Sequence, residues 1–145
     1  MIKIELGTEG DQVFIREHLI DFNRQKLPEH NNTAYGKVTY VVKDDHNHIQ
    51  GGIAAHYSWG RMQIDFLWID DQLRQKGVGK ELLARVENYA IEKGCTLLML
   101  DTFSFQAPDF YKKNGFSVFG VIENHPEGHH QYFLQKRIRS VNSSN

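Results

Sequence analysis

The sequence predicts an α/β fold with a mixed, mostly antiparallel central sheet and flanking helices, in the order β-α-β-β-β-α-β-α-β-β. Three observations support this prediction. Short apolar segments, some alternating and some continuous, recur along the chain as strands do. Longer segments between them carry apolar residues at helical spacing. One of these helices separates two continuous apolar strands and is long enough for a right-handed parallel crossover.

The elements of the N-terminal half follow from local signals. Residues 2–6 alternate between apolar and polar and predict a first strand. Thr8 precedes two acids, so we expect it to cap a helix that runs to about Lys26. Three further strands are expected at 38–44, 49–59 and 62–69. The last of these ends in the continuous apolar run 66–69, which predicts burial on both faces.

The C-terminal half is read in the same way. Residues 76–94 show helical spacing and end at Gly94, a residue that favours a helix C-terminus. A continuous apolar strand is expected at 95–103, and a short helix at 107–113 is stopped by Asn114 and Gly115. The final strands, 116–123 and 129–138, flank the turn 125–128 as a hairpin.

Composition places the chain among ordinary globular domains. Its 145 residues predict a single domain over 1–139 followed by the polar tail 140–145. A net charge of −1 argues against a nucleic-acid partner. No stretch approaches the roughly 20 apolar residues of a membrane span, and the N-terminus does not resemble a signal peptide. Cys95 is the sole cysteine, which fits a reducing compartment, so we expect a cytoplasmic protein.

The segment from Arg74 to Lys80 is the clearest candidate site. It lies between a predicted strand and a predicted helix, where unpaired backbone N–H groups and the helix dipole favour an anion. Gly77 and Gly79 let the backbone approach a bulky diphosphate, and three basic residues add positive charge. A plain tight turn would use the same residues, and neither the Walker pattern nor the dinucleotide pattern is present.

Two motifs at matching positions along the chain indicate what this loop binds. The pattern Arg74-x-x-Gly77-x-Gly79 after a strand resembles the acetyl-CoA signature of the GNAT N-acetyltransferase superfamily. The block 107–116 resembles that family's later helix-turn-strand motif, in which an alanine precedes Tyr111 by four residues and Gly-Phe follows. The predicted element order is also the GNAT one, so the resemblance covers nearly the whole chain.

The resemblance implies how acetyl-CoA would bind as co-substrate. In similar enzymes the strand before the loop splays away from the next parallel strand, and pantetheine lies in the gap. The main chain that would contact pantetheine and the thioester carbonyl belongs to Leu67, Trp68 and Ile69. The pyrophosphate would be held by Arg74 and the backbone of Gln75, Lys76, Gly77, Val78, Gly79 and Lys80. Many relatives carry an asparagine seven residues before the tyrosine; here Ser104 stands there, and Ser104 or Gln106 could replace its contact.

Tyr111 is the candidate general acid implied by the resemblance. A departing thiolate benefits from a proton, and a positioned tyrosine can supply one. The simpler alternative is that Tyr111 only packs the short helix against the sheet.

The general base is less well defined. The attacking ammonium must lose a proton, and some relatives use a glutamate on the strand before the loop. Gln63 occupies that position and cannot serve, whereas Asp65 lies two residues on. Asp65 is therefore the nearest substitute, although it could be an ordinary exposed strand acid. His56 or a chain of water molecules are the alternatives.

The number of histidines suggests a metal site, but their spacing does not match one. His46 and His48 fall in one turn and His125, His129 and His130 at the final hairpin, without a zinc-binding pattern. We expect no metal. The hairpin could instead line the acceptor pocket or a homodimer interface. The acceptor-binding candidates are Glu29, His30, Tyr35 and Glu123.

These features predict an acetyl-CoA-dependent N-acetyltransferase. The expected reaction moves an acetyl group to a primary amine of a small molecule by direct attack through a ternary complex. A peptide or protein amine is the alternative acceptor, and a non-catalytic acetyl-CoA sensor is the alternative class of protein.

Overall fold

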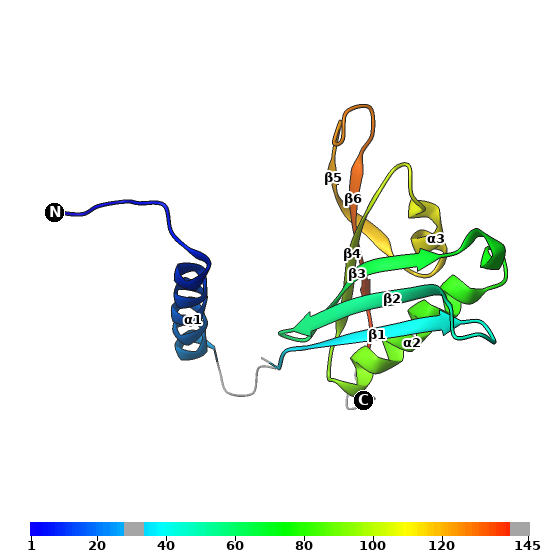
Figure 1. Cartoon of the computed structure of the whole chain (residues 1–145), viewed down its shortest axis with the longest axis horizontal. Helices are drawn as coiled ribbons and strands as arrows, with labels where there is room; N and C mark the ends of the chain where they lie inside the picture. Colours follow the sequence, from blue (N-terminus) through cyan, green and yellow to red (C-terminus); the bar gives the residue numbers. More distant parts are fainter. Residues whose placement is uncertain (28–33, 140–145) are drawn as a thin grey trace. The chain divides into compact units, whose positions relative to one another are not determined.

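A computed structural model describes residues 1–27 and 34–139 (Figure 1). Contacts within the chain group it into two compact units, Met1–Asn31 and Asn32–Asn145. Each unit is described by itself. No helix in the described ranges is long and apolar enough to cross a membrane.

The first unit contains one helix, α1 (Glu9–Lys26). Thr8 caps it as predicted: its hydroxyl accepts a hydrogen bond from the backbone N–H of Asp11, and the Asp11 carboxylate accepts one from the N–H of Thr8. The strand predicted at 2–6 does not form. A strand needs backbone partners as well as an alternating pattern, and no strand in the part of the chain the structure describes pairs with this segment.

The second unit is built on a six-stranded sheet with the order β1-β2-β3-β4-β6-β5. Its strands are β1 (Gly36–Lys43), β2 (Ile49–Ser58), β3 (Arg61–Ile69), β4 (Leu97–Phe103), β5 (Ser117–Ile122) and β6 (Gln131–Arg137). All neighbouring strands are antiparallel except β3 and β4, which are parallel. The predicted fold class is confirmed.

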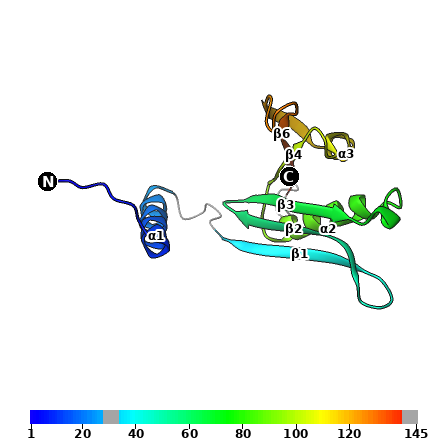
Figure 2. The same cartoon turned by 45° about the horizontal axis from the view of Figure 1, so that its top comes forward.

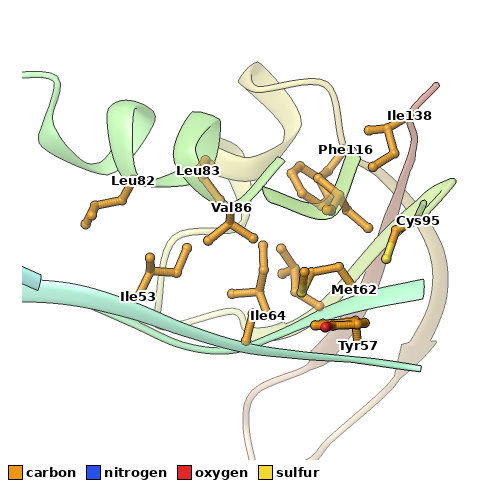
Figure 3. Close-up of a cluster of buried hydrophobic side chains, with 14 of the residues drawn as sticks. Ile53, Tyr57, Met62, Ile64, Leu82, Leu83, Val86, Cys95, Phe116 and Ile138 are labelled. Carbon is orange, nitrogen blue, oxygen red and sulfur yellow. The ribbon is translucent and has the colours of Figure 1, made fainter. Parts of the chain in front are cut away.

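One helix precedes β4 in the chain and another follows it. Helix α2 (Val78–Glu92) provides the predicted crossover between the parallel strands and lies against β1–β3 (Figure 2). Its apolar residues pack on the alternate inward-facing side chains of the sheet, as Val86 does near Ile53 and Met62 (Figure 3). The short helix α3 (Pro108–Lys113) follows β4, and a 3-10 turn (Asp71–Leu73) follows β3.

The parallel strands stay together over a short distance and then part. Within the described chain, β3 and β4 pair only from Arg61↔Leu97 to Gln63↔Met99, although β3 continues to Ile69 and β4 to Phe103. Figure 1 shows β4, β5 and β6 turning away from the direction of β1–β3. We call the space between the two diverging ends the fork. It is the splay that the resemblance implied.

One expectation about burial on β3 is wrong. The end of β3 was expected to be buried on both faces, but Phe66 is 74% exposed and Trp68 is 55% exposed. Leu67 and Ile69 point to the other face, where they pack against the core. Helix α2 packs on the face of the sheet that carries Leu67 and Ile69, and Phe66 and Trp68 point to the opposite face.

Candidate functional site

The loop before α2 presents backbone N–H groups at the helix start. Gln75 and Gly77 both have positive φ, 65° and 79°, which turn the chain sharply into the helix. The helix has no side-chain cap, and its first turn closes with the bond from the Glu81 N–H to the Gly77 carbonyl. The N–H groups of the first turn are therefore available to an anion.

The two glycines of this loop have different roles. A Cβ on Gly77 would meet no atom within 4 Å, so this residue is needed for its left-handed φ of +79°. A Cβ on Gly79 would lie 3.0 Å from the Phe110 ring and 3.1 Å from the Ile69 side chain. Gly79 thus allows α2 to pack closely against the ends of β3 and α3. Together these features give a backbone cradle that fits a diphosphate.

Basic side chains surround this cradle. Lys76 and Lys80 are exposed, and Arg74 Nε lies 3.0 Å from Asp71 Oδ1. Lys80 also lines a cleft of about 280 Å³ beside α2, together with Lys113 and Lys136. Glu87 lines the same cleft and forms an ion pair with Lys136 at 3.2 Å.

The diverging half of β3 offers the other part of the site. Leu67, Trp68 and Ile69 pair with β2 on one side, at Ile53, Gly52 and Gly51. On the side facing β4 they have no strand partner in the described chain. This backbone edge can therefore pair with an extended ligand in the fork, as the pantetheine interpretation requires.

A β-bulge places a hydrogen-bonded histidine–aspartate pair at the point where the fork opens. Ala54 pairs with Phe66 and Ala55 with Ile64, so Asp65 is the extra residue of the bulge. Its Oδ2 lies 2.7 Å from His56 Nδ1 on β2. The two side chains proposed separately as bases thus form one pair, and Gln63 lies directly across from His56.

Tyr111 lies on α3, where it packs against the core. Its ring makes edge-on contacts with Phe110 and Phe116, at centroid distances of 5.2 Å and 5.9 Å. Burial raises the pKa of Tyr111 to about 12. Its hydroxyl makes no hydrogen bond with the described residues. No buried polar side-chain atom among them lacks a partner, so the Tyr111 hydroxyl is not fully buried and solvent or a ligand can reach it. The packing role is real and leaves the hydroxyl available.

The two residues suggested to replace the family asparagine have local partners. The Gln106 side-chain carbonyl accepts from the Thr102 hydroxyl and from the Phe103 N–H, at 3.2 Å and 2.8 Å. The Ser104 hydroxyl accepts from the His130 N–H at 3.0 Å and lies 3.3 Å from His129 Nδ1. Both hold the end of β4 in place, and a contact of either with the cofactor stays a prediction.

Comparison with known proteins identifies the family. A model described as "Acetyltransferase (GNAT) family" matches residues 9–116, most of the chain. The chain belongs to the GNAT acetyltransferase family. Members of this family use acetyl-CoA as the acetyl donor. That the fork and the Arg74–Lys80 loop hold this donor stays a prediction.

Individual relatives agree with this assignment. Blasticidin-S acetyltransferase of Streptomyces morookaense is 35% identical over 91 residues, which is 62% of this chain and 67% of that protein. An acetyltransferase from Bacillus cereus ATCC 14579 is 42% identical, with a TM-score of 0.89 over 94% of this chain and 98% of that one. A Bacillus anthracis str. Ames protein assigned as a streptothricin acetyltransferase, in complex with acetyl coenzyme A, shares the fold: 24% identity and a TM-score of 0.62 over 79% of this chain and 67% of that one.

One acidic residue near the fork has no signal in the sequence. Asp101 on β4 lies two residues beyond the last paired position, as Asp65 does on β3. It is exposed, and its Oδ2 accepts a hydrogen bond from Gln131 Nε2 at 2.9 Å. The two carboxylates therefore occupy equivalent positions on the two arms of the fork. Only the strand register shows this, because the sequence spacing of the two residues carries no such signal.

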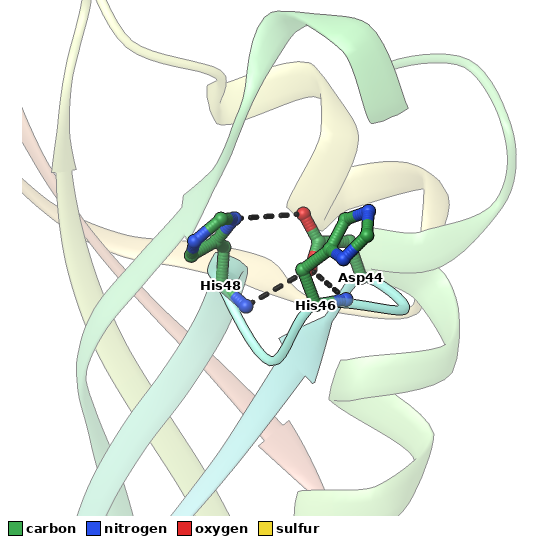
Figure 4. A network of polar contacts seen from close by, with 3 residues as sticks. All are labelled: Asp44, His46 and His48. Carbon is green, nitrogen blue, oxygen red and sulfur yellow. Dashed lines mark hydrogen bonds and ion pairs between the residues drawn. The ribbon is translucent and has the colours of Figure 1, made fainter.

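The histidines outside the fork have structural explanations. The Asp44 carboxylate accepts hydrogen bonds from the backbone N–H groups of His46 and His48 and lies 3.3 Å from His48 Nδ1, which shapes the β1–β2 turn (Figure 4). Among the residues the structure describes, no group of three or more His, Cys, Asp or Glu side chains could hold a metal ion. Of the acceptor candidates, Tyr35 and Glu123 are exposed, and Glu29 and His30 lie outside the described residues.

Proposed function

We propose that this GNAT protein transfers an acetyl group from acetyl-CoA to a primary amine of a small molecule, by direct attack in a ternary complex. The observation that carries the proposal is the fork, whose open backbone edge on β3 leads directly to the unpaired N–H groups at the start of α2. An extended thioester with a diphosphate at its far end matches both features.

Each part of the fork has a role in this reaction. Acetyl-CoA supplies the acetyl thioester. The backbone of Leu67–Ile69 orients the thioester carbonyl and stabilises the negative charge that develops on its oxygen. The Arg74–Lys80 segment holds the pyrophosphate, with Ser104 and Gln106 as candidate cofactor contacts at the end of β4. Asp65 places a negative charge beside the incoming ammonium.

Tyr111 is proposed as the donor to the departing sulfur. With its pKa raised to about 12, Tyr111 is protonated throughout the working pH range, so it donates and never acts as a base. Full proton transfer to a thiolate of ordinary pKa, about 8.5, would be uphill by roughly 5 kcal/mol. We therefore assign Tyr111 a strong hydrogen bond to the sulfur, which stabilises the charge without requiring complete transfer.

The acceptor class is supported by the relatives and by the charge of the site. Blasticidin-S acetyltransferase and the streptothricin acetyltransferase are named for small molecules. Two carboxylates, Asp65 and Asp101, stand at the opening of the fork, where they favour a positively charged acceptor. No metal is required by this chemistry.

A single assay separates the competing functions. Release of free thiol from acetyl-CoA is measured with polyamines, aminoglycosides, amino acids and peptides as acceptors, alongside acetyl-CoA binding by calorimetry. Turnover with a small amine supports the proposal, and turnover with peptides alone would assign the protein-acetylating alternative. Binding without turnover on any acceptor would indicate a sensor. Failure to bind acetyl-CoA would refute all three.

We also propose that the protein is a homodimer paired through β5. Strands β1 and β5 are the two edges of the sheet. The edge β1 carries Lys37 and Lys43, whereas β5 has no charged residue and exposes Phe119, Val121 and Ile122. Val121→Lys should give a monomer by light scattering, while Val41→Lys, at a similarly exposed valine on β1, should leave the dimer intact. A monomeric wild type would refute the proposal.

A further inference from the structure

The strongest unassigned feature of the fork is the pair formed by His56 and Asp65. Their side chains are 31% and 29% exposed, and 2.7 Å separates His56 Nδ1 from Asp65 Oδ2. Asp65 reaches His56 because the bulge inserts it as an extra residue into β3. Bulges often re-aim a side chain beside an active site.

A hydrogen bond to an ionised Asp65 fixes the tautomer of a neutral His56 imidazole. An ionised carboxylate can only accept, so His56 Nδ1 must carry the proton and donate it to Asp65. In the neutral imidazole the lone pair then lies on Nε2, which has no hydrogen bond among the described residues. His56 therefore has a free proton-accepting atom, held in the required tautomer by Asp65.

The neighbouring charges on the same face are few. Lys37 on β1 and Gln63 on β3 lie directly across from His56 in the strand register. Arg61 is two residues before Gln63, on the same face and diagonal to His56. Of the groups that face His56 from β1 and β3, Asp65 is the acid. The side chains of Lys37 and Arg61 are donors and cannot accept a proton. None of them can accept a proton from His56 except Asp65.

We infer that His56 is the general base of this enzyme and that Asp65 is a positioning residue. The inference rests on the proposed acetyl transfer. The acceptor ammonium gives one proton to His56 Nε2, and the freed lone pair forms the N–C bond to the acetyl carbon. The C–S bond then breaks, its electron pair leaves on sulfur, and the second amine proton passes to the thiolate, which Tyr111 hydrogen-bonds. His56 returns its proton to solvent.

The test compares two histidine–aspartate pairs of the same chain. In wild type, kcat should fall on acidification, since a protonated imidazole cannot accept a proton. His56→Gln should lower kcat at neutral pH by about 100-fold and remove that acidic limb, with the Kd for acetyl-CoA within about twofold of wild type. The control His48→Gln removes the partner of Asp44 in the remote β1–β2 turn and should leave the pH profile unchanged.

Asp65→Asn tests the positioning role. It should lower kcat by about tenfold, because the amide can hold His56 in the wrong tautomer. The double variant should be no slower than His56→Gln, since both residues act on one proton transfer. A His56→Gln variant that binds acetyl-CoA and keeps the acidic limb would overturn the inference, as would fully additive losses. If wild type turns over no amine, the proposed function itself has failed.

Discussion

In the proposed reaction, the donor side and the acceptor side of the fork are made from different chemical groups. The donor side is mostly backbone: the open edge of β3, and the N–H groups that the left-handed turn at Gly77 directs at the start of α2. The acceptor side, defined here to include every side chain proposed to act in the reaction itself, has His56 and Asp65 paired on one arm and Tyr111 on α3. One side depends on chain conformation and the other on individual functional groups.

This difference decides how each side responds to substitution. A backbone site survives changes of exposed side chains and fails when a required φ is lost. A side-chain site keeps its shape when one functional atom is removed, but the reaction step that needed that atom becomes slower. Substitutions on the donor side should therefore change acetyl-CoA affinity, and those on the acceptor side should change turnover.

After His56→Gln, the largest expected effect is also on the acceptor side. Tyr111→Phe removes one oxygen from a ring that is already packed between Phe110 and Phe116, so the fold is retained. A hydrogen bond to a charged sulfur contributes roughly 1.5–3 kcal/mol, so kcat should fall roughly 10- to 100-fold. Calorimetry should give an unchanged Kd for acetyl-CoA. Equal loss of affinity and turnover, or unchanged turnover, would show that Tyr111 only packs.

The matching change on the donor side is Gly77→Val. The added side chain meets no atom within 4 Å, so its cost comes from the φ of +79°. A positive φ at valine costs about 1–3 kcal/mol, and the loop should rearrange to relieve this strain. The rearrangement should weaken acetyl-CoA binding by about tenfold and change kcat at saturation little.

A second glycine provides the control. Gly128 in the β5–β6 hairpin has a φ of +84° and equally open surroundings. Gly128→Val should cost similar stability in urea without changing the Kd for acetyl-CoA. If both variants bind acetyl-CoA as wild type does, the Gly77 turn is not part of the donor site.

The same contrast explains what the sequence could predict. The elements around the Arg74–Lys80 loop follow from local order: a strand, a loop with Gly77 and Gly79, then a helix, and the structure has this strand and this helix where the sequence predicted them. Binding of the donor there stays a prediction. Helix α1 and its Thr8 cap were equally local. The prediction of a strand at 2–6 was wrong because an alternating pattern does not supply a strand to pair with. Phe66 and Trp68 were misjudged because a continuous apolar run does not show that α2 packs on only one face of the sheet, the face of Leu67 and Ile69.

Side-chain sites depend on register, which the sequence leaves open. His56 and Asp65 were separate candidates until the bulge opposite Ala54 and Ala55 brought them together. Asp101 was not found because its equivalence to Asp65 exists only after Gln63 is aligned with Met99. A one-residue shift of either strand would turn these side chains to the other face of the sheet.

Burial of Tyr111 predicts a smaller effect, on stability at alkaline pH. Its pKa of about 12 in the folded state exceeds the ordinary value of about 10, so its stabilising contribution is complete below about pH 10 and lost as the pH rises through about 12. Between pH 9 and pH 11, the free energy of unfolding should fall by about 1 kcal/mol more in wild type than in Tyr111→Phe. Urea titrations at the two pH values measure this difference, and equal falls would contradict it.

The smallest expected effect concerns a side chain on the donor side. Arg74 Nε lies 3.0 Å from Asp71 Oδ1, so this exposed carboxylate competes with a pyrophosphate for the guanidinium. Exposed pairs contribute at most about 1 kcal/mol, so Asp71→Asn should tighten acetyl-CoA binding only about two- to threefold. The gain should shrink at high salt, because both charges are exposed. Weaker binding in Asp71→Asn would mean instead that Asp71 holds Arg74 in its binding position, making this part of the donor side depend on a side chain after all.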